Sequence, residues 1–179
     1  MGKNTSMADI VRRGLFLLIF LACTSFLRAA DWYSVATGSW SVASTWASVS
    51  GGAPGAGVPA AGDNVYIEGG YSVTLDAATA NLNSLTISSG STFITAGNYS
   101  VTAAAITVNG IYRNSSSGTV TGSMTVNGRY QHAFTTTAGT IPAATWSSGS
   151  VCEITGYTTA GSATPVIGGI GQAFANLVW

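Results

Sequence analysis

A seven-residue phrase occurs twice in this chain, as VNGIYRN at 108–114 and as VNGRYQH at 126–132. The first valine of each copy ends a triplet of apolar, threonine and apolar residues, at 106–108 and 124–126, and two similar triplets occur earlier, at 73–75 and 85–87. Alternation with a period of two is typical of a β-strand that buries one face. Because clusters of Ser, Gly and Asn separate the triplets, these segments are too short and too often interrupted for helices. The repeats therefore indicate an all-β fold.

The Asn-Gly step inside each phrase has two interpretations. As a type I′ hairpin turn, used twice, it would indicate an antiparallel β-sandwich. As a corner between two faces of one coil, it would indicate a stacked solenoid. Thr86, Thr107 and Thr125 are 21 and 18 residues apart, which gives a path of roughly 60 Å and suits one turn of a β-helix. We therefore predict a single-stranded parallel β-helix (β-solenoid) with an amino-terminal cap, with the antiparallel β-sandwich as the alternative.

The first thirty residues have the pattern of a secretory signal peptide. A basic stretch that ends at Arg13 precedes the apolar run GLFLLIFLAC, and the small pair Ala29-Ala30 follows. This run is short for a membrane span, which needs about 20 residues. Acylation at Cys23, as in a lipoprotein, is the less favoured alternative because Phe20 and Leu21 fit that pattern poorly. We expect cleavage near Ala29 or Ala30 and secretion or display at the cell surface.

Three regions follow from these patterns. We expect a signal peptide at 1–30, an amino-terminal cap with a Gly/Pro/Ala-rich loop at 31–63, and β-helix repeats at 64–179, truncated at the carboxy terminus. An open β-helix end exposes backbone groups and apolar side chains, and Trp40 and Trp46 are well placed to cover it. Because the sequence stops at Trp179 inside a strand-like segment, we expect a fragment of a larger protein.

Charge and cysteine content exclude several classes of protein. Without residues 1–30 the chain has two cations, Arg113 and Arg129, and five carboxylates, a net charge of −3. This balance lacks the basic footprint of a nucleic-acid-binding protein. Cys152 is then the only cysteine, so no disulfide framework can form within the chain. The fold must depend on packing and backbone pairing.

The block before the repeats resembles a known family. The similarity covers about residues 33–94 and rests on a fixed order of residues: Trp40, Ser44-Thr45-Trp46, Val58-Pro59, Gly62-Asp63-Asn64-Val65-Tyr66-Ile67, Gly70, Val73-Thr74-Leu75-Asp76 and Leu85-Thr86-Ile87. This order resembles the start of β-helical domains in large surface proteins of Bacteroidota-type bacteria, many of them secreted by the type IX route. It is also similar to the eight-glycine domain of animal secreted and membrane proteins. The resemblance implies a β-helix, although Tyr71 stands where relatives often carry His.

Catalytic and metal-binding chemistry has little support in the sequence. Glycoside hydrolysis needs two carboxylates that face each other across a cleft, whereas Asp63 is expected to bond the backbone of its own turn. His132 is the only histidine, and we predict that it is a solvated turn residue. Cys152 is expected to be a buried, inert hydrophobe. Asp63, Asn64 and Asp76 could supply calcium ligands, but their spacing matches no calcium-loop signature.

Binding is the chemistry that the repeats leave open. Tyr112 and Tyr130 occupy equal positions in the two phrases. They could pack inside the coil, which we favour, or form an exposed strip that contacts carbohydrate. The outward threonines Thr86, Thr107 and Thr125 could likewise face an ordered lattice such as ice, but their unequal spacing argues against it.

These observations favour an exported structural or adhesin-like β-helix module of the cell surface without catalysis of its own and without cofactors or metals. The alternative is a carbohydrate-binding or polysaccharide-degrading β-helix protein, although fold analogy alone is weak support for an activity. Expected partners are surface polysaccharide or the rest of a larger surface protein, together with the secretion machinery during export. Nucleic acid is not expected.

Overall fold

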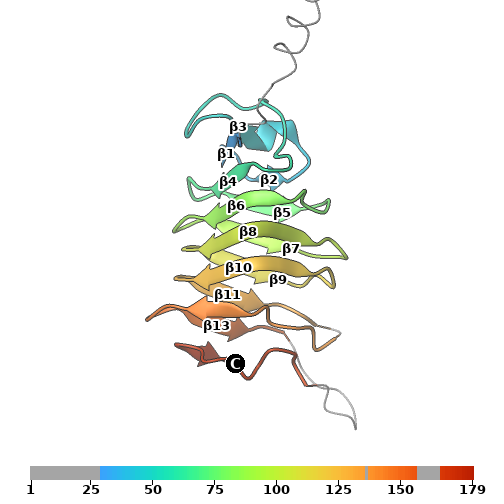
Figure 1. The fold of residues 1–179 in the computed structure, drawn as a ribbon, viewed down its shortest axis with the longest axis vertical. Coiled ribbons are helices and arrows are strands. Elements are labelled where there is room, and N and C mark those ends of the chain that lie inside the picture. Colours follow the sequence, from blue (N-terminus) through green and yellow to red (C-terminus); the bar gives the residue numbers. More distant parts are fainter. Residues whose placement is uncertain (1–28, 136, 157–165) are drawn as a thin grey trace, which may run out of the picture.

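The chain folds into a stack of flat coils (Figure 1). A computed structural model describes residues 29–135, 137–156 and 166–179. Cys23 and all but the last two residues of the predicted signal peptide lie outside the described residues. The fold is a parallel β-solenoid of about four turns. The described ranges contain a single short 3₁₀-helix, η1 (Ala43–Thr45), and no helix long and apolar enough to cross a membrane. The predicted all-β parallel β-helix is confirmed.

Two largely parallel sheets form the two sides of the solenoid, and from β4 to β13 each coil contributes one strand to each sheet. The first sheet consists of β3 (Trp46–Ala47), β1 (Asp31–Ser34), β4 (Asn64–Ile67), β6 (Leu82–Ile87), β8 (Val101–Val108), β10 (Val120–Val126) and β12 (Ala144–Trp146). The second consists of β2 (Gly38–Ser39), β5 (Ser72–Leu75), β7 (Thr92–Thr95), β9 (Ile111–Asn114), β11 (Arg129–His132), β13 (Val151–Ile154) and β14 (Leu177–Val178).

The repeated Asn-Gly step is a corner and not a hairpin turn. Strands β8 and β9 on either side of Gly110 belong to different sheets, as do β10 and β11 on either side of Gly128. The two phrases lie in register, with Val108 beside Val126 and Tyr112 beside Tyr130. Among the strand pairs of the described chain, only β1 with β3 is antiparallel. The alternative of an antiparallel sandwich is therefore wrong.

The core lies between the two sheets, because the strands bury the inward-facing residues of their triplets, as the alternating burial of β4, β5, β7, β9, β11 and β13 shows. In β6, Leu82, Leu85 and Ile87 are buried, while the threonine of each triplet faces outward. Buried aromatic rings continue along the solenoid axis, from Trp40 through Phe93 to Tyr112 and Tyr130, with neighbouring ring centroids 5.3–5.9 Å apart. Each coil buries its apolar edge mainly against its neighbours, as in other solenoids.

The tryptophan pair packs into the amino-terminal end of this core, as predicted. Trp46 is fully buried, its ring meets Trp40 edge to face at 5.0 Å, and its Nε1 donates to the carbonyl oxygen of Trp40 at 2.8 Å. Strand β3 also pairs with β1 and covers the first edge of the sheet. The pair therefore closes the end that an uncapped solenoid would expose.

Asp63 ties the segment before β1 to the turn before β4. Its Oδ1 accepts from the backbone N–H of Ala30 at 2.9 Å, and its Oδ2 accepts from the Trp32 indole at 2.7 Å and the Ala60 N–H at 2.8 Å. The bond from Ala60 confirms the predicted turn contact, and the bonds from Ala30 and Trp32 join this turn to the residue before β1 and to β1 itself.

We expect Asp63→Asn to lower the free energy of unfolding by about 1–3 kcal/mol. The variant would replace one accepting carboxylate oxygen by an NH₂ group, which cannot accept a hydrogen bond from the N–H donors at that position. The measurement is urea denaturation followed by circular dichroism. Asp31→Asn is the matched control, since exposed Asp31 accepts one bond from Asn64, and it should cost less than about 0.5 kcal/mol. Equal losses in both variants would contradict the anchoring role of Asp63.

Candidate functional site

The two tyrosines proposed for carbohydrate contact lie inside the solenoid. Tyr112 and Tyr130 both have an exposed fraction of 0%, and their rings meet edge to face at 5.5 Å. The interpretation as an exposed strip is therefore wrong. Each tyrosine is the second residue of its strand, and in both strands the second and fourth residues are buried in the core. Burial raises the pKa of both phenols above the ordinary value, so they stay neutral and belong to the core.

A buried polar column runs beside these rings. Thr95, Asn114 and His132 are register partners in β7, β9 and β11. Thr95 Oγ1 donates to Asn114 Oδ1 at 2.8 Å, and Asn114 Nδ2 donates to the Tyr130 hydroxyl at 3.0 Å. These bonds satisfy side chains that would otherwise destabilise the core.

His132 is a core residue, and its prediction as a solvated turn residue is wrong. It is fully buried at the end of β11, where its ring stacks on Phe134 with a centroid distance of 4.5 Å. Its Nε2 lies 2.6 Å from the carbonyl oxygen of Ala138, which makes Nε2–H the donor, while Nδ1 has no partner among the described residues. Burial lowers the pKa of the imidazole, partly opposed by the bond to Ala138. The ring is therefore neutral.

This burial predicts a pH-dependent stability. The folded pKa of His132 is depressed, so the unfolded chain binds the proton more readily, and stability is lost as pH falls below the ordinary histidine value of about 6.5. The contribution of one such group is no steeper than about 1.4 kcal/mol per pH unit. Urea denaturation between pH 7.5 and pH 5, values chosen to stay above most carboxylate titration, measures this loss.

The control for this prediction is His132→Gln, which keeps an amide donor near Nε2 but does not titrate. We expect the variant to be less stable than the parent at pH 7.5 and to lose less stability on acidification. A parent and a variant with the same pH dependence would contradict the role of His132.

Asp76, considered as a calcium ligand, and Glu153, another carboxylate of the described chain, both bind parts of the fold. Asp76 accepts from the N–H and hydroxyl of Ser41 at 2.9 and 2.6 Å, and these bonds lower its pKa despite opposing desolvation. Glu153 pairs with Gln131 and Arg129, both at 2.8 Å. No three His, Cys, Asp or Glu side chains gather as a metal site in the described ranges. The absence of catalysis stays a prediction.

Cys152 is buried in β13 between Tyr130 and Leu177 in the strand register, as predicted for an inert hydrophobe. Burial raises the pKa of its thiol to about 12. Since the thiolate is the reactive form, this cysteine is unreactive at neutral pH.

The outward threonines form a straight row, although their sequence spacing is unequal. Thr86, Thr107, Thr125 and Thr145 are register partners in β6, β8, β10 and β12. Strand spacing places them about 4.8 Å apart. The coils therefore differ in length only in the corners and loops between the strands, and not in the paired strands themselves.

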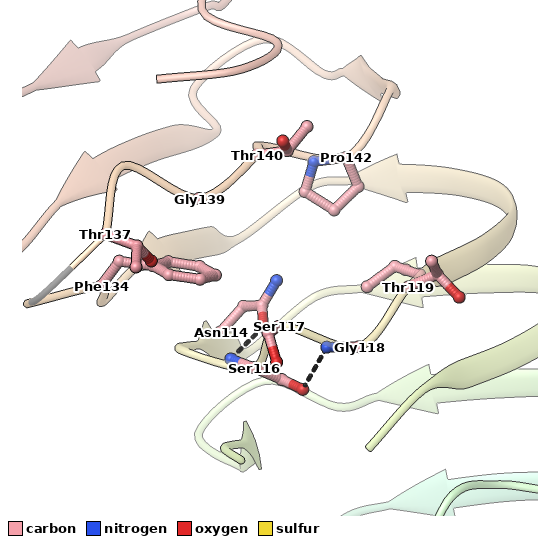
Figure 2. Close-up of a pocket in the computed structure, with 11 residues that line it drawn as sticks. Asn114, Ser116, Ser117, Gly118, Thr119, Phe134, Thr137, Gly139, Thr140 and Pro142 are labelled. Atoms are coloured by element: carbon pink, nitrogen blue, oxygen red, sulfur yellow. Dashed lines mark hydrogen bonds between the residues drawn. The ribbon is translucent and has the colours of Figure 1, made fainter. Parts of the chain in front are cut away.

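A hollow lies between two successive loops of the described chain. One wall runs from Asn114 at the end of β9 to Val120 at the start of β10, and the other is formed after β11 by Phe134, Thr137, Gly139, Thr140 and Pro142. Figure 2 shows Gly139 to Pro142 across from Asn114 and Ser116, with Phe134 at one end and Thr119 at the other. The cavity volume is about 610 Å³, within the range of small-ligand pockets, roughly 300–1,000 Å³.

The first wall of this pocket is rigidly held. Asn114 Oδ1 accepts from the N–H of Ser116 at 3.0 Å, and Ser116 Oγ accepts from the N–H of Gly118 at 3.0 Å (Figure 2). Ser116 Oγ also donates to the carbonyl oxygen of Tyr99 in the coil before, at 2.8 Å. The polar groups of this wall are thus preorganised.

The sequence patterns do not predict this pocket. The segment NSSSGT at 114–119 has the composition of a turn, and no repeat marks the second wall. The available signal was the excess of small hydroxyl side chains in both loops. Their convergence depends on the stacking of successive coils.

A second, smaller hollow of about 440 Å³ lies near the amino-terminal cap. Its lining includes Ser34, Ser50, Glu68 and Tyr71. Ser34 Oγ accepts from the Glu68 N–H at 2.8 Å, and Ser50 donates to the Glu68 carboxylate. Its acidic group is therefore already bonded within the fold.

Two stacked parallel sheets, with buried polar groups bonded mostly within the solenoid, define an all-β structural module. A family model for the G8 domain matches residues 45–135, from η1 to the segment after β11. The chain therefore belongs to the G8 domain family, an extracellular domain family. No curated protein and no solved structure matches the chain.

Proposed function

We propose that this chain is an exported structural module of the cell surface, adhesin-like in role and without catalysis of its own. The observation that carries the proposal is the continuous stack of coils within a G8 domain, in which the carboxylates serve the fold. Asp63 and Asp76 each bind backbone and side-chain donors of the amino-terminal region, and Glu153 pairs with Arg129. A rigid, elongated scaffold of this kind suits a spacer or a display platform.

The finer assignment is a region of a large secreted surface protein of the Bacteroidota type, related to the eight-glycine domain. It is supported by the residue order from Trp40 to Ile87 and by the signal-like segment at 1–30. On this assignment the partners are the remainder of the surface protein, surface polysaccharide and, during export, the secretion machinery. Anchoring through Cys23 is the less favoured arrangement.

Export is tested by fusing residues 1–30 to alkaline phosphatase, an enzyme that is active only after it leaves the bacterial cytoplasm. We expect active phosphatase from the fusion and a loss of that activity in the matched variant Leu17→Arg, which places a charge in the apolar run. Inactive phosphatase from the parent fusion would contradict export.

Display and the absence of catalysis need separate measurements. Protease treatment of intact cells that make the full chain should remove it from the surface while a cytoplasmic marker survives. The purified full chain should leave neutral and acidic polysaccharides intact. Depolymerisation that follows the protein through purification would overturn the structural role in favour of a polysaccharide-degrading one.

A further inference from the structure

We infer that the pocket between the loops after β9 and β11 binds one unit of a neutral saccharide. This inference goes beyond the structural role proposed above and does not depend on export. It places carbohydrate contact on residues other than Tyr112 and Tyr130, which lie inside the core. The chemistry of the two walls and the shape between them support this assignment.

The floor of the pocket supplies a fixed amide. Asn114 lines the pocket, although its exposed fraction is only 2%. Its Oδ1 accepts hydrogen bonds from the Thr95 hydroxyl and the Ser116 N–H, and its Nδ2 donates one hydrogen bond to the Tyr130 hydroxyl. An amide nitrogen has two protons, so Asn114 has one more to donate from a position that the strand register holds in place.

The opposite wall supplies hydroxyls. Thr137 and Thr140 line the pocket and are solvent-exposed. Neither side chain makes a hydrogen bond to another residue in the described part of the chain, whereas Thr119 on the first wall bonds only weakly to Ser100, at 3.3 Å. A hydroxyl both donates and accepts, so these groups match a ligand that carries several hydroxyls of its own.

Apolar groups complete the shape. Phe134 stands at one end of the pocket and Pro142 beside Thr140, as Figure 2 shows. Phe134 is only 6% exposed, so it closes this end of the pocket, and the half-buried Pro142 offers the apolar surface on which the C–H face of a sugar ring would pack. The sugar hydroxyls would then reach the polar groups at the edges, which is the usual composition of a small-ligand site. Phe134 is held in place by its stack on His132.

The lining also sets the charge of the ligand. None of the described residues that line the pocket is Asp, Glu, Lys, Arg or His. A carboxylated or sulfated sugar would lose water there without gaining an opposite charge. A neutral sugar unit meets no such penalty, so the pocket favours neutral glycans over acidic ones.

The test is isothermal titration of the full chain with oligosaccharides of mannan, glucan and galactan, and with oligogalacturonate as the acidic comparison. We expect at least one neutral oligosaccharide to bind and oligogalacturonate not to bind. Thr137→Val and Thr140→Val should each weaken binding about threefold to tenfold, because each removes one hydrogen bond without changing the shape. Thr119→Trp should abolish binding by filling the pocket.

The matched control is Thr74→Val, an exposed threonine on the outer face of β5, which should bind as the parent does. All four variants change exposed side chains, and unchanged thermal melting by circular dichroism will show that each is folded. The inference is overturned if no neutral oligosaccharide binds at millimolar concentration, if only oligogalacturonate binds, or if binding survives Thr119→Trp. None of these outcomes bears on the export or protease measurements.

Discussion

Replacing Gly110 by alanine is expected to lower the free energy of unfolding by roughly 3 kcal/mol, the upper end for overpacking a tight site. A Cβ at this corner would overlap the backbone carbonyl oxygens of Ser88 and Ser91 in the coil before. These atoms cannot move aside, because the Ser91 carbonyl accepts from Ile111 N–H and Ser91 N–H donates to the Ser88 carbonyl, both at 3.0 Å. Urea denaturation followed by circular dichroism measures the loss.

Gly171→Ala is the matched control for this change. No described heavy atom lies within 4 Å of a Cβ built at Gly171 apart from its chain neighbours, so we expect an effect within about 0.5 kcal/mol. Gly128→Ala should behave like Gly110→Ala, since its Cβ would overlap the carbonyl oxygens of Asn109 and Gly110. If the corner variants and Gly171→Ala unfold at the same urea concentration, close stacking of the corners is not what the repeated glycine provides.

Tyr112→Ala is expected to cost about 3–5 kcal/mol, as for other buried aromatic residues replaced by alanine. The ring is fully buried in the middle coil and touches Phe93 and Tyr130, with centroid distances of 5.3 and 5.5 Å. Its removal leaves a cavity that two rigid sheets cannot close. Such a loss is a large share of the usual domain stability of about 5–15 kcal/mol.

Tyr99→Ala is the control, because the Tyr99 side chain is 40% exposed on a loop, and it should cost less than about 1 kcal/mol. Tyr112→Phe should retain most of the stability, since the ring and not the hydroxyl fills the core. The prediction fails if Tyr112→Ala is as stable as Tyr99→Ala.

The repeats predicted the fold because a solenoid is built from local information. Alternation around Thr107 and Thr125 identified the strands, and the repeated Val, Gly and Tyr positions identified which residues lie side by side in β8 to β11. The tryptophan pair was likewise predicted at the amino-terminal end, because an open solenoid end needs an apolar cover.

Predictions fail where a residue's environment depends on the path of a loop that has no repeat. The position of His132 in the phrase predicts a turn residue, yet the loop that follows β11 folds back so that Phe134 and Ala138 lie against the ring and bury it. The threonine row is regular in space but not in the sequence, because strands pair in register whatever the lengths of the corners between them.

The strands, the corners and the stacking order follow from the sequence, since they depend on periodicity and on glycine at positions where a neighbouring backbone comes close. Which polar residues meet depends instead on tertiary contacts. Asn114, Thr137 and Thr140 form one pocket because the loop after β11 lies over the loop after β9, one coil further along. Strand pairing places these two loops next to each other. Because the loop residues do not belong to a sequence repeat, this neighbourhood cannot be predicted from the local sequence.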